Sequence, residues 1–289
     1  MAINYEHIMS LKSEGTENSY TDKETMLYAL GIGFGRDPFN EDELRFVYEG
    51  VNDPKYLKTV PTMATVLQWG GGAMQGSGIN YLMVVHGEQR VTLHRPLPTS
   101  GTIISDERII GAFDKGAGKG AVIVSEKKIR LKGTNEPLVT LVSSTFARGD
   151  GGFGGPSAGA PEPHPIPERK PDETFEASIL KDQAFVYALS GDRNPLHRDP
   201  KIAKAAGFPA PIIHGLCTYG TTCRAIITNV LNYDAAKITG YDVRFSSPVF
   251  PGETVLLDVW KDGNVISFRA RLKERDVVAI NNGKCTLAA

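Results

Sequence analysis

Apolar and polar positions alternate along two segments in each half of the chain. In the first half these segments read TIISDERII and AVIVSEKKIRL, and in the second half they read TVLLDVW and VISFRARL. A period of two is typical of β-strands that bury one face and expose the other. The pattern therefore predicts antiparallel sheet in both halves.

The longest predicted helix begins at Gly215 in the second half. Apolar side chains recur along it at three- and four-residue spacing, at Leu216, Tyr219, Cys223, Ile226, Ile227 and Val230. This spacing predicts a core helix that the sheet wraps. The corresponding place in the first half holds five glycines, Gly70, Gly71, Gly72, Gly76 and Gly78. Each glycine weakens a helix by about 1 kcal/mol, so we predict no continuous helix there and, instead, a cavity that takes a long apolar chain.

A segment rich in glycine and proline divides the chain. From Arg148 to Asp172 it reads RGDGGFGGPSAGAPEPHPIPERKPD, which suits neither a helix nor a strand interior. We therefore expect an N-terminal unit at 1–148, a linker at 149–172 and a C-terminal unit at 173–289. Short motifs recur in the same order on both sides of the linker, for example the Tyr-Ala-Leu triplets at 28–30 and 187–189, which indicates a duplication.

Size and charge narrow the class of protein. A length of 289 residues suits two domains. The net charge of −1 shows no basic footprint for nucleic acid, and no apolar run approaches the ~18 residues of a membrane span. The cysteines, Cys217, Cys223 and Cys285, form neither a disulfide framework nor a metal-ligand spacing, which favours a reducing compartment.

The residues best suited to catalysis lie within 185–220. Helix-breaking glycine and proline residues place Asp192, Asn194 and His197 in one turn. Asp192 and His197 can then hold one water as a general acid/base pair. The backbone N–H of Gly215, at the positive end of the predicted helix, suits a developing oxyanion.

These residues also admit other interpretations. Asp192 and Asn194 can simply stabilise a turn while His197 faces solvent and His214 caps the helix. A metal site from Asp192, His197, Asp199 and His214 matches no known ligand spacing. The glycines of 31–35 follow a helical pattern rather than a strand, so they indicate a helix end rather than a dinucleotide loop. No metal and no cofactor is predicted.

The duplicated turn differs between the two halves. The positions of Asp192, Asn194 and His197 correspond to Gly35, Asp37 and Asn40 in the first half. Only the second half therefore carries the full set of candidate catalytic residues.

The string YALSGDRNPLH at 187–197, followed by Asp199-Pro200 and by HGLCT at 214–218, resembles the MaoC-like (R)-specific enoyl-CoA hydratases. The first half adds YALG at 28–31, YEG at 48–50 and HGEQ at 86–89. These motifs, with GGFGG at 151–155, resemble the type-two hydratase domains of peroxisomal multifunctional beta-oxidation enzymes. The resemblance implies an α+β double hot-dog fold, two tandem antiparallel sheets on central helices, whose first repeat lacks a full central helix.

The same resemblance implies roles for individual residues. It makes Asp192 and His197 the catalytic pair, with Asn194 in the same loop and Gly215 as oxyanion donor. The implied contacts to an acyl-CoA substrate are His86, Gly87, Lys115, Arg193, Pro195, Leu196 and Phe245. Glu49 matches a carboxylate whose role, catalytic or structural, stays open.

The implied reaction is the reversible hydration of a trans-2-enoyl-CoA to a (3R)-3-hydroxyacyl-CoA. A thioesterase and a non-catalytic acyl-CoA-binding protein stay open as alternatives, because hot-dog folds host several functions. A homodimer and a peroxisomal location are also implied, although the final Leu287-Ala288-Ala289 matches no peroxisomal address and a cytoplasmic location is the alternative. Without dehydrogenase or carrier segments, we expect a standalone hydratase or a fragment.

Overall fold

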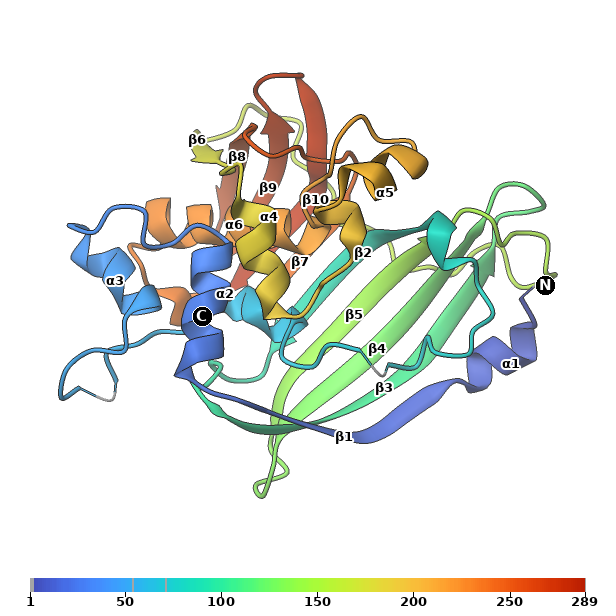
Figure 1. Cartoon of the computed structure of the whole chain (residues 1–289), viewed down its shortest axis with the longest axis horizontal. Coiled ribbons are helices and arrows are strands. Elements are labelled where there is room, and N and C mark those ends of the chain that lie inside the picture. The colour runs from blue at the N-terminus through green and yellow to red at the C-terminus, as the bar shows by residue number, and fades with distance from the viewer. Residues whose placement is uncertain (1–2, 54, 71, 289) are drawn as a thin grey trace.

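A single curved antiparallel sheet runs through the whole chain (Figure 1). The structure, a computed structural model, describes residues 3–53, 55–70 and 72–288, so Gly71 lies outside the described residues. Ten strands follow the order β1-β3-β4-β5-β2-β7-β10-β9-β8-β6. The first half supplies β1 (Lys12–Tyr20), β2 (Val84–Leu93), β3 (Gly101–Asp114), β4 (Ala121–Leu131) and β5 (Pro137–Ala147). The second half supplies β6 (Glu173–Ser178), β7 (Ile238–Phe245), β8 (Thr254–Asp262), β9 (Val265–Leu272) and β10 (Val277–Leu287).

The two halves join strand to strand between β2 and β7. The ladder between them runs from Glu88 opposite Arg244 to Thr92 opposite Gly240. The four segments of alternating polarity lie within β3, β4, β8 and β9, so their prediction as antiparallel strands is confirmed. The halves are therefore not separate sheets but one continuous surface, on which a site can draw side chains from both.

Six α-helices accompany the sheet in the described part of the chain. They are α1 (Tyr5–Ser10), α2 (Asp22–Gly31), α3 (Glu41–Val47), α4 (Gln183–Tyr187), α5 (Pro200–Ala205) and α6 (Gly215–Asn229). Within that described part, none of these helices has the length and apolar character needed to cross a bilayer.

The predicted core helix is α6, and it begins at Gly215 as the spacing of its apolar residues indicates. Its apolar side chains are buried in the main hydrophobic cluster together with residues of both halves. The Tyr219 hydroxyl also donates to the backbone oxygen of Tyr241 on β7 at 2.8 Å, which ties the helix to the middle of the sheet. The N-terminus of α6 is thereby held at a fixed place beside β7.

The first half has no counterpart of α6. A short 3₁₀ turn at Pro61–Thr65 is followed by irregular chain up to the next short turn at Tyr81–Met83, across the residues described there. Gly70, Gly76 and Gly78 adopt φ values of 78°, 81° and 75°, a left-handed conformation that glycine adopts without strain. The prediction that no continuous helix forms here is confirmed, and the glycines are the physical reason.

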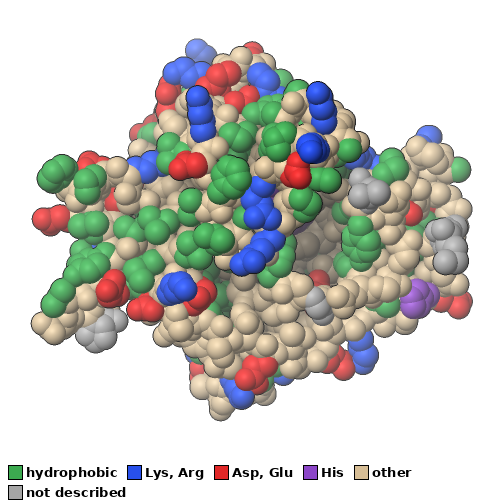
Figure 2. Space-filling model, in the orientation of Figure 1, with side chains coloured by type: hydrophobic (Ala, Val, Ile, Leu, Met, Phe, Trp, Pro, Cys, Tyr) green, Lys and Arg blue, Asp and Glu red, His purple; other side chains and the backbone are tan. Residues whose placement is uncertain are grey.

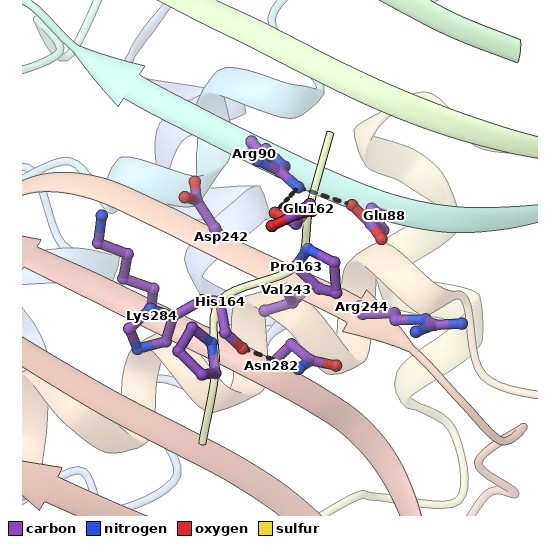
Figure 3. Close-up of a pocket in the computed structure, with 11 residues that line it drawn as sticks. Glu88, Arg90, Glu162, Pro163, His164, Asp242, Val243, Arg244, Asn282 and Lys284 are labelled. Carbon is purple, nitrogen blue, oxygen red and sulfur yellow. Dashed lines mark hydrogen bonds and ion pairs between the residues drawn. The ribbon is translucent and has the colours of Figure 1, made fainter. Parts of the chain in front are cut away.

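The linker crosses the face of the β2–β7 joint that lies away from α6. Because side chains alternate along a strand, Glu88, Arg90 and Asp242 project to this face while their neighbours enter the core. Arg90 donates to the backbone oxygen of Glu162 at 2.8 Å, and Asn282 donates to that of His164 at 2.7 Å (Figure 3). A polar pocket of about 220 Å³ remains beneath the linker.

This pocket has balanced charge. Its lining carries three cationic side chains, Arg90, Arg244 and Lys284, and three carboxylates, Glu88, Glu162 and Asp242 (Figure 3). Arg90 and Glu88 form an ion pair at 3.0 Å. These side chains are suited to hold the linker on the sheet. Because their charges balance, the pocket offers no excess of charge to an ionic ligand.

Candidate active site

The turn that carries Asp192 is built by the side chains it presents. Helix α4 runs into a 3₁₀ turn at Ala188–Ser190, which ends at Gly191 with φ 137°. Asp192 Oδ1 then accepts from the Asn194 N–H at 3.1 Å, and Asn194 Oδ1 accepts from the Leu196 N–H at 3.0 Å. The side-chain oxygen Oδ1 of Asn194 thus caps the next turn, so the Asn194 side chain shapes the loop.

His197 is buried rather than turned to solvent, which makes the solvent-facing interpretation wrong. Only 9% of its surface is exposed. Its Nδ1 lies 2.8 Å from the backbone oxygen of Ile212, and because a carbonyl can only accept, Nδ1 carries the hydrogen. The Nε2 lone pair therefore remains available. Burial lowers the pKa of His197, partly offset by the bond to Ile212 and by the charge of Asp192, so the imidazole is neutral near pH 7.

His214 links the other parts of the site. Its Nε2–H donates to the backbone oxygen of Asp192 at 3.0 Å, and its ring stacks on that of His197 with centroids 3.8 Å apart. Burial, followed by the neighbouring His197, lowers the pKa of His214 to about 3. His214 also occupies the N-cap position of α6, so one neutral side chain joins the Asp192 turn, the His197 ring and the helix. The sequence indicated His214 as a helix cap and as part of the HGLCT motif, but not its stacking on His197.

Asp192, His197 and His214 bring one ligating atom each to within 4.8 Å of one another. A water that bridges two groups by hydrogen bonds of about 2.8 Å spans distances up to about 5.5 Å. The group therefore has the right dimensions to hold one water between a carboxylate and an imidazole. Asp199, the fourth residue of the metal site considered from the sequence, instead accepts from the Lys201 N–H at 2.8 Å and caps α5. The four-residue metal site therefore does not form.

The three remaining side chains have donor types that metals also accept. The two imidazole planes, however, are stacked at 30° to each other, so their lone pairs do not converge on one centre. This geometry favours a bridging water over a metal ion.

Gly215 lies where a carbonyl oxygen can be received. It is the first residue of α6, where backbone N–H groups lack partners within the helix and the helix dipole is positive. A Cβ at this position would make only ordinary contact with the ring of Phe245, at 3.4 Å, so packing does not require glycine here, and the missing side chain leaves room for a ligand group beside the amide. The Phe245 ring in turn lies 5.0 Å from that of His86.

His86 and Gly87 reach this place through an irregularity in β2. The β2–β5 register shifts between His86 and Glu88, and a Cβ at Gly87 would lie 3.1 Å from the backbone oxygen of Ser144. Such a bulge redirects the side chains beside it. His86 donates from Nε2 to the backbone oxygen of Glu88 at 3.1 Å, and burial lowers its pKa to about 4.

The other predicted contacts lie on two separate elements. Arg193 and Pro195 are exposed on the Asp192 turn and Leu196 is half-buried there. Lys115 lies at the β3–β4 turn, where its Nζ donates to the backbone oxygen of Ser157 at 2.8 Å. Glu49 is exposed on the chain that follows α3 and is not among the residues that the structure gathers at the site.

Two surface features lie near the Asp192 turn. A pocket of about 460 Å³ lies against His197 and is lined mainly by apolar side chains such as Phe185, Pro211 and Phe250. Sequence reasoning missed it, although the prolines of 209–211 are its signal. Figure 2 shows a further hollow between the helices of the second half and the free end of the first-half sheet, with Lys and Arg side chains at its rim.

Comparisons with known proteins agree along the whole chain. Residues 163–283 match the model of the MaoC-like domain, and residues 18–149 match that of the MFE-2 hydratase 2 N-terminal domain. The enoyl-CoA hydratase ChsH3 of Mycobacterium tuberculosis is 39% identical, with 98% of each chain covered. The peroxisomal enoyl-CoA hydratase 2 of Arabidopsis thaliana is 35% identical over 95% of this chain and 92% of its own.

Solved structures agree with these sequence matches. The MaoC-like dehydratase from Phytophthora capsici superposes with a TM-score of 0.85 at 34% identity, with 98% of each chain covered. A Mycobacterium tuberculosis protein described as a double hot-dog fold superposes with a TM-score of 0.55 at 12% identity, over 95% of this chain and 96% of its own. The predicted double hot-dog fold is thereby confirmed.

Proposed function

The chain belongs to the MaoC-like hydratase 2 family, and from that premise we propose that it catalyses the reversible hydration of trans-2-enoyl-CoA to (3R)-3-hydroxyacyl-CoA. One observation carries the proposal. The Asp192 carboxylate and the His197 imidazole lie within bridging distance of one water, next to His214, which occupies the N-cap position of α6.

The protonation states suit the addition of water. The neutral His197 ring, fixed by its Nδ1–H bond to Ile212, presents Nε2 as an acceptor that orients the water. The Asp192 carboxylate accepts a proton as the oxygen attacks the β carbon, and a proton returns to the α carbon on the same face. One molecule of water is added, and no redox partner is required. General acid/base help of this kind contributes about 10²- to 10⁴-fold.

The thioester oxygen gains negative charge as the β carbon is attacked. We assign the Gly215 N–H as its donor, since it belongs to the first turn of α6, and one such donor contributes on the order of 3 kcal/mol. Phe245, which lies beside Gly215, would enclose the thioester together with His86, whose ring lies 5.0 Å from that of Phe245, and the adjacent Gly87. Lys115 would meet a more distant part of the CoA moiety, together with Arg193, Pro195 and Leu196 on the catalytic turn.

Family resemblance also supports proposals about assembly and location. We propose a homodimer, as is expected for this family, and a peroxisomal location, which the names of the Arabidopsis thaliana hydratase and of the Drosophila melanogaster multifunctional enzyme carry. We also propose that the two halves, 1–148 and 173–289 around the linker, divide the work. The second half carries the catalysis and the first accommodates the acyl chain.

Incubation with trans-2-decenoyl-CoA tests the activity. We expect loss of the enoyl thioester absorbance, a (3R)-3-hydroxy product and no free thiol. Release of thiol would indicate a thioesterase instead. Tight binding with unchanged absorbance would mean that the site only holds the ligand, and either result overturns the proposal.

A further inference from the structure

We propose that Trp69 determines the acyl-chain specificity of this site, by forming the apolar wall along which the chain leaves the catalytic pair. The inference rests on the proposed hydratase function and adds to it a residue from the first half. Trp69 belongs to the irregular segment that replaces the central helix. It is a large apolar side chain that remains 45% exposed although it contacts the catalytic turn.

The contact is made at Gly191, immediately before Asp192. A Cβ at Gly191 would come 2.9 Å from Trp69 Cβ and 3.0 Å from Trp69 Cγ, so the tryptophan packs directly on the glycine backbone. Gly191 also has φ 137°, which side chains other than hydrogen rarely allow. Trp69 and the Asp192 turn therefore keep a fixed spacing.

The segment that carries Trp69 is anchored by three different strands. Asn18 of β1 donates to the backbone oxygen of Leu67 at 2.6 Å. Lys127 of β4 donates to Gln68 Oε1 at 3.2 Å and pairs with Glu107 of β3 at 3.5 Å. Glu107 also accepts from the N–H of Ala73 at 3.3 Å. Anchors before and after Trp69 make it a preorganised wall rather than a mobile loop.

The direction of the substrate places the chain near this wall. The β carbon must lie at Asp192 and His197, because the hydroxyl is added there, while the thioester lies toward Gly215. The carbons beyond the β carbon then leave past the residues that flank the pair. A crotonyl chain ends one carbon past the β carbon, whereas a decenoyl chain continues for seven. Contact with Trp69 should therefore favour long chains.

Kinetics of Trp69→Ala give the first test. We expect the ratio of kcat/KM for trans-2-decenoyl-CoA to that for crotonyl-CoA to fall at least tenfold, since even one methylene in an apolar pocket contributes about 10- to 200-fold in discrimination. Trp69→Phe should restore much of the ratio. The control is Trp260→Phe, because Trp260 is buried in the second half and its indole N–H bonds the backbone oxygen of Arg169 at 2.8 Å. An unchanged ratio in Trp69→Ala overturns the inference, even where both rates fall.

Fluorescence supplies a second test that does not depend on turnover. The chain has two tryptophans, so the emission of Trp260→Phe reports Trp69 alone. Saturated decanoyl-CoA, which cannot be hydrated, should shift this emission, whereas CoA without an acyl chain should not. Trp69→Phe should lose the acyl-dependent shift. If decanoyl-CoA leaves the Trp69 emission unchanged while wild type hydrates decenoyl-CoA, the role of Trp69 is refuted and the hydratase proposal stands. If wild type does not hydrate decenoyl-CoA, the hydratase proposal itself is refuted.

Discussion

At the scale of single residues, burial decides which side chains can do acid/base chemistry. His197 and His214 stack at 3.8 Å, so a charge on one disfavours a charge on the other. Both bond backbone oxygens through one nitrogen, which fixes the tautomer of each ring. The outcome is a neutral imidazole pair beside one carboxylate, poised to orient water near neutral pH.

Substitution of either member of the catalytic pair should abolish most activity. We expect Asp192→Asn and His197→Gln each to lower kcat by about 10²- to 10⁴-fold, because each removes the proton acceptor or the orienting nitrogen. Asp192→Asn should leave thermal unfolding nearly unchanged, since an amide oxygen can still accept from Asn194. His197→Gln should cost at most about 1 kcal/mol for the altered bond to Ile212.

Asp37→Asn is the matched control for the catalytic pair. Asp37 lies in the counterpart turn of the first half, where its Oδ1 accepts from the Phe39 N–H at 2.9 Å. Its turnover should equal that of wild type. Wild-type turnover in Asp192→Asn or His197→Gln would reject the assignment of the pair.

The buried His214 should make the protein sensitive to acid. Its pKa is lowered from 6.5 to about 3 in the folded state, so the unfolded chain binds a proton first as pH falls. The contribution of the neutral His214 to the free energy of unfolding is therefore present above pH 6.5 and is lost progressively below it. Between pH 7.5 and 5 we expect His214 to remove about 2 kcal/mol from the free energy of unfolding. Urea unfolding at fixed protein concentration measures this, and an identical pH slope in His214→Asn would contradict it.

At the scale of elements, α6 contains two glycines with different roles, one in packing and one in ligand access. Gly220 lies in the helix interior, where a Cβ would come 2.4 Å from Ile32 Cγ2 and 2.9 Å from Tyr28 Oη, so it permits close approach of α2. Gly215 lies at the N-terminus, where a Cβ would make only ordinary contact with Phe245. The same residue type is therefore required for packing in one turn and for ligand access in another.

Alanine at these two glycines should have opposite effects. Gly215→Ala should keep or slightly raise stability, by up to about 1 kcal/mol, yet lower kcat/KM at least tenfold because the methyl group occupies the place of the thioester. Gly220→Ala should cost about 1–3 kcal/mol through overpacking and leave turnover per folded molecule unchanged. Thermal unfolding and initial rates separate the two, and full activity in Gly215→Ala would remove its role as oxyanion donor.

At the scale of the whole molecule, the duplication is used unequally. The first-half turn that corresponds to the catalytic one makes structural contacts instead. Asn40 donates to the Tyr233 hydroxyl at 3.0 Å, and Arg36 donates to the backbone oxygen of Ser178 at 2.7 Å and to Gln183 Oε1 at 2.8 Å. The first-half turn therefore links the two halves, while the second-half turn carries the candidate catalytic residues.

The halves should unfold together. The β2–β7 ladder and a core cluster that draws from both halves mean that neither can separate without exposing apolar surface. Trp260→Phe leaves Trp69 as the probe of the first half, and Trp69→Phe leaves Trp260 as the probe of the second. In each variant, the denaturant transition followed by tryptophan fluorescence should coincide with the transition of the same variant followed by circular dichroism. A fluorescence transition that precedes the loss of secondary structure would indicate independent halves.

The sequence by itself determined what depends on local pattern. Period-two alternation located four strands, the spacing of apolar residues located α6 from its first residue, and glycines excluded a central helix in the first half. The motif around Asp192 and His197 was legible because turn-forming residues crowd there, and the resemblance it carries led to the family. These features follow from backbone preferences and side-chain periodicity, which neighbours in the chain decide.

Only the tertiary structure decided what depends on residues far apart in the chain. The merging of both sheets through β2 and β7, the stacking of His214 on His197, and the packing of Trp69 on Gly191 join segments separated by up to about 150 positions. Such contacts are set by how complete elements pack, so no local pattern specifies them.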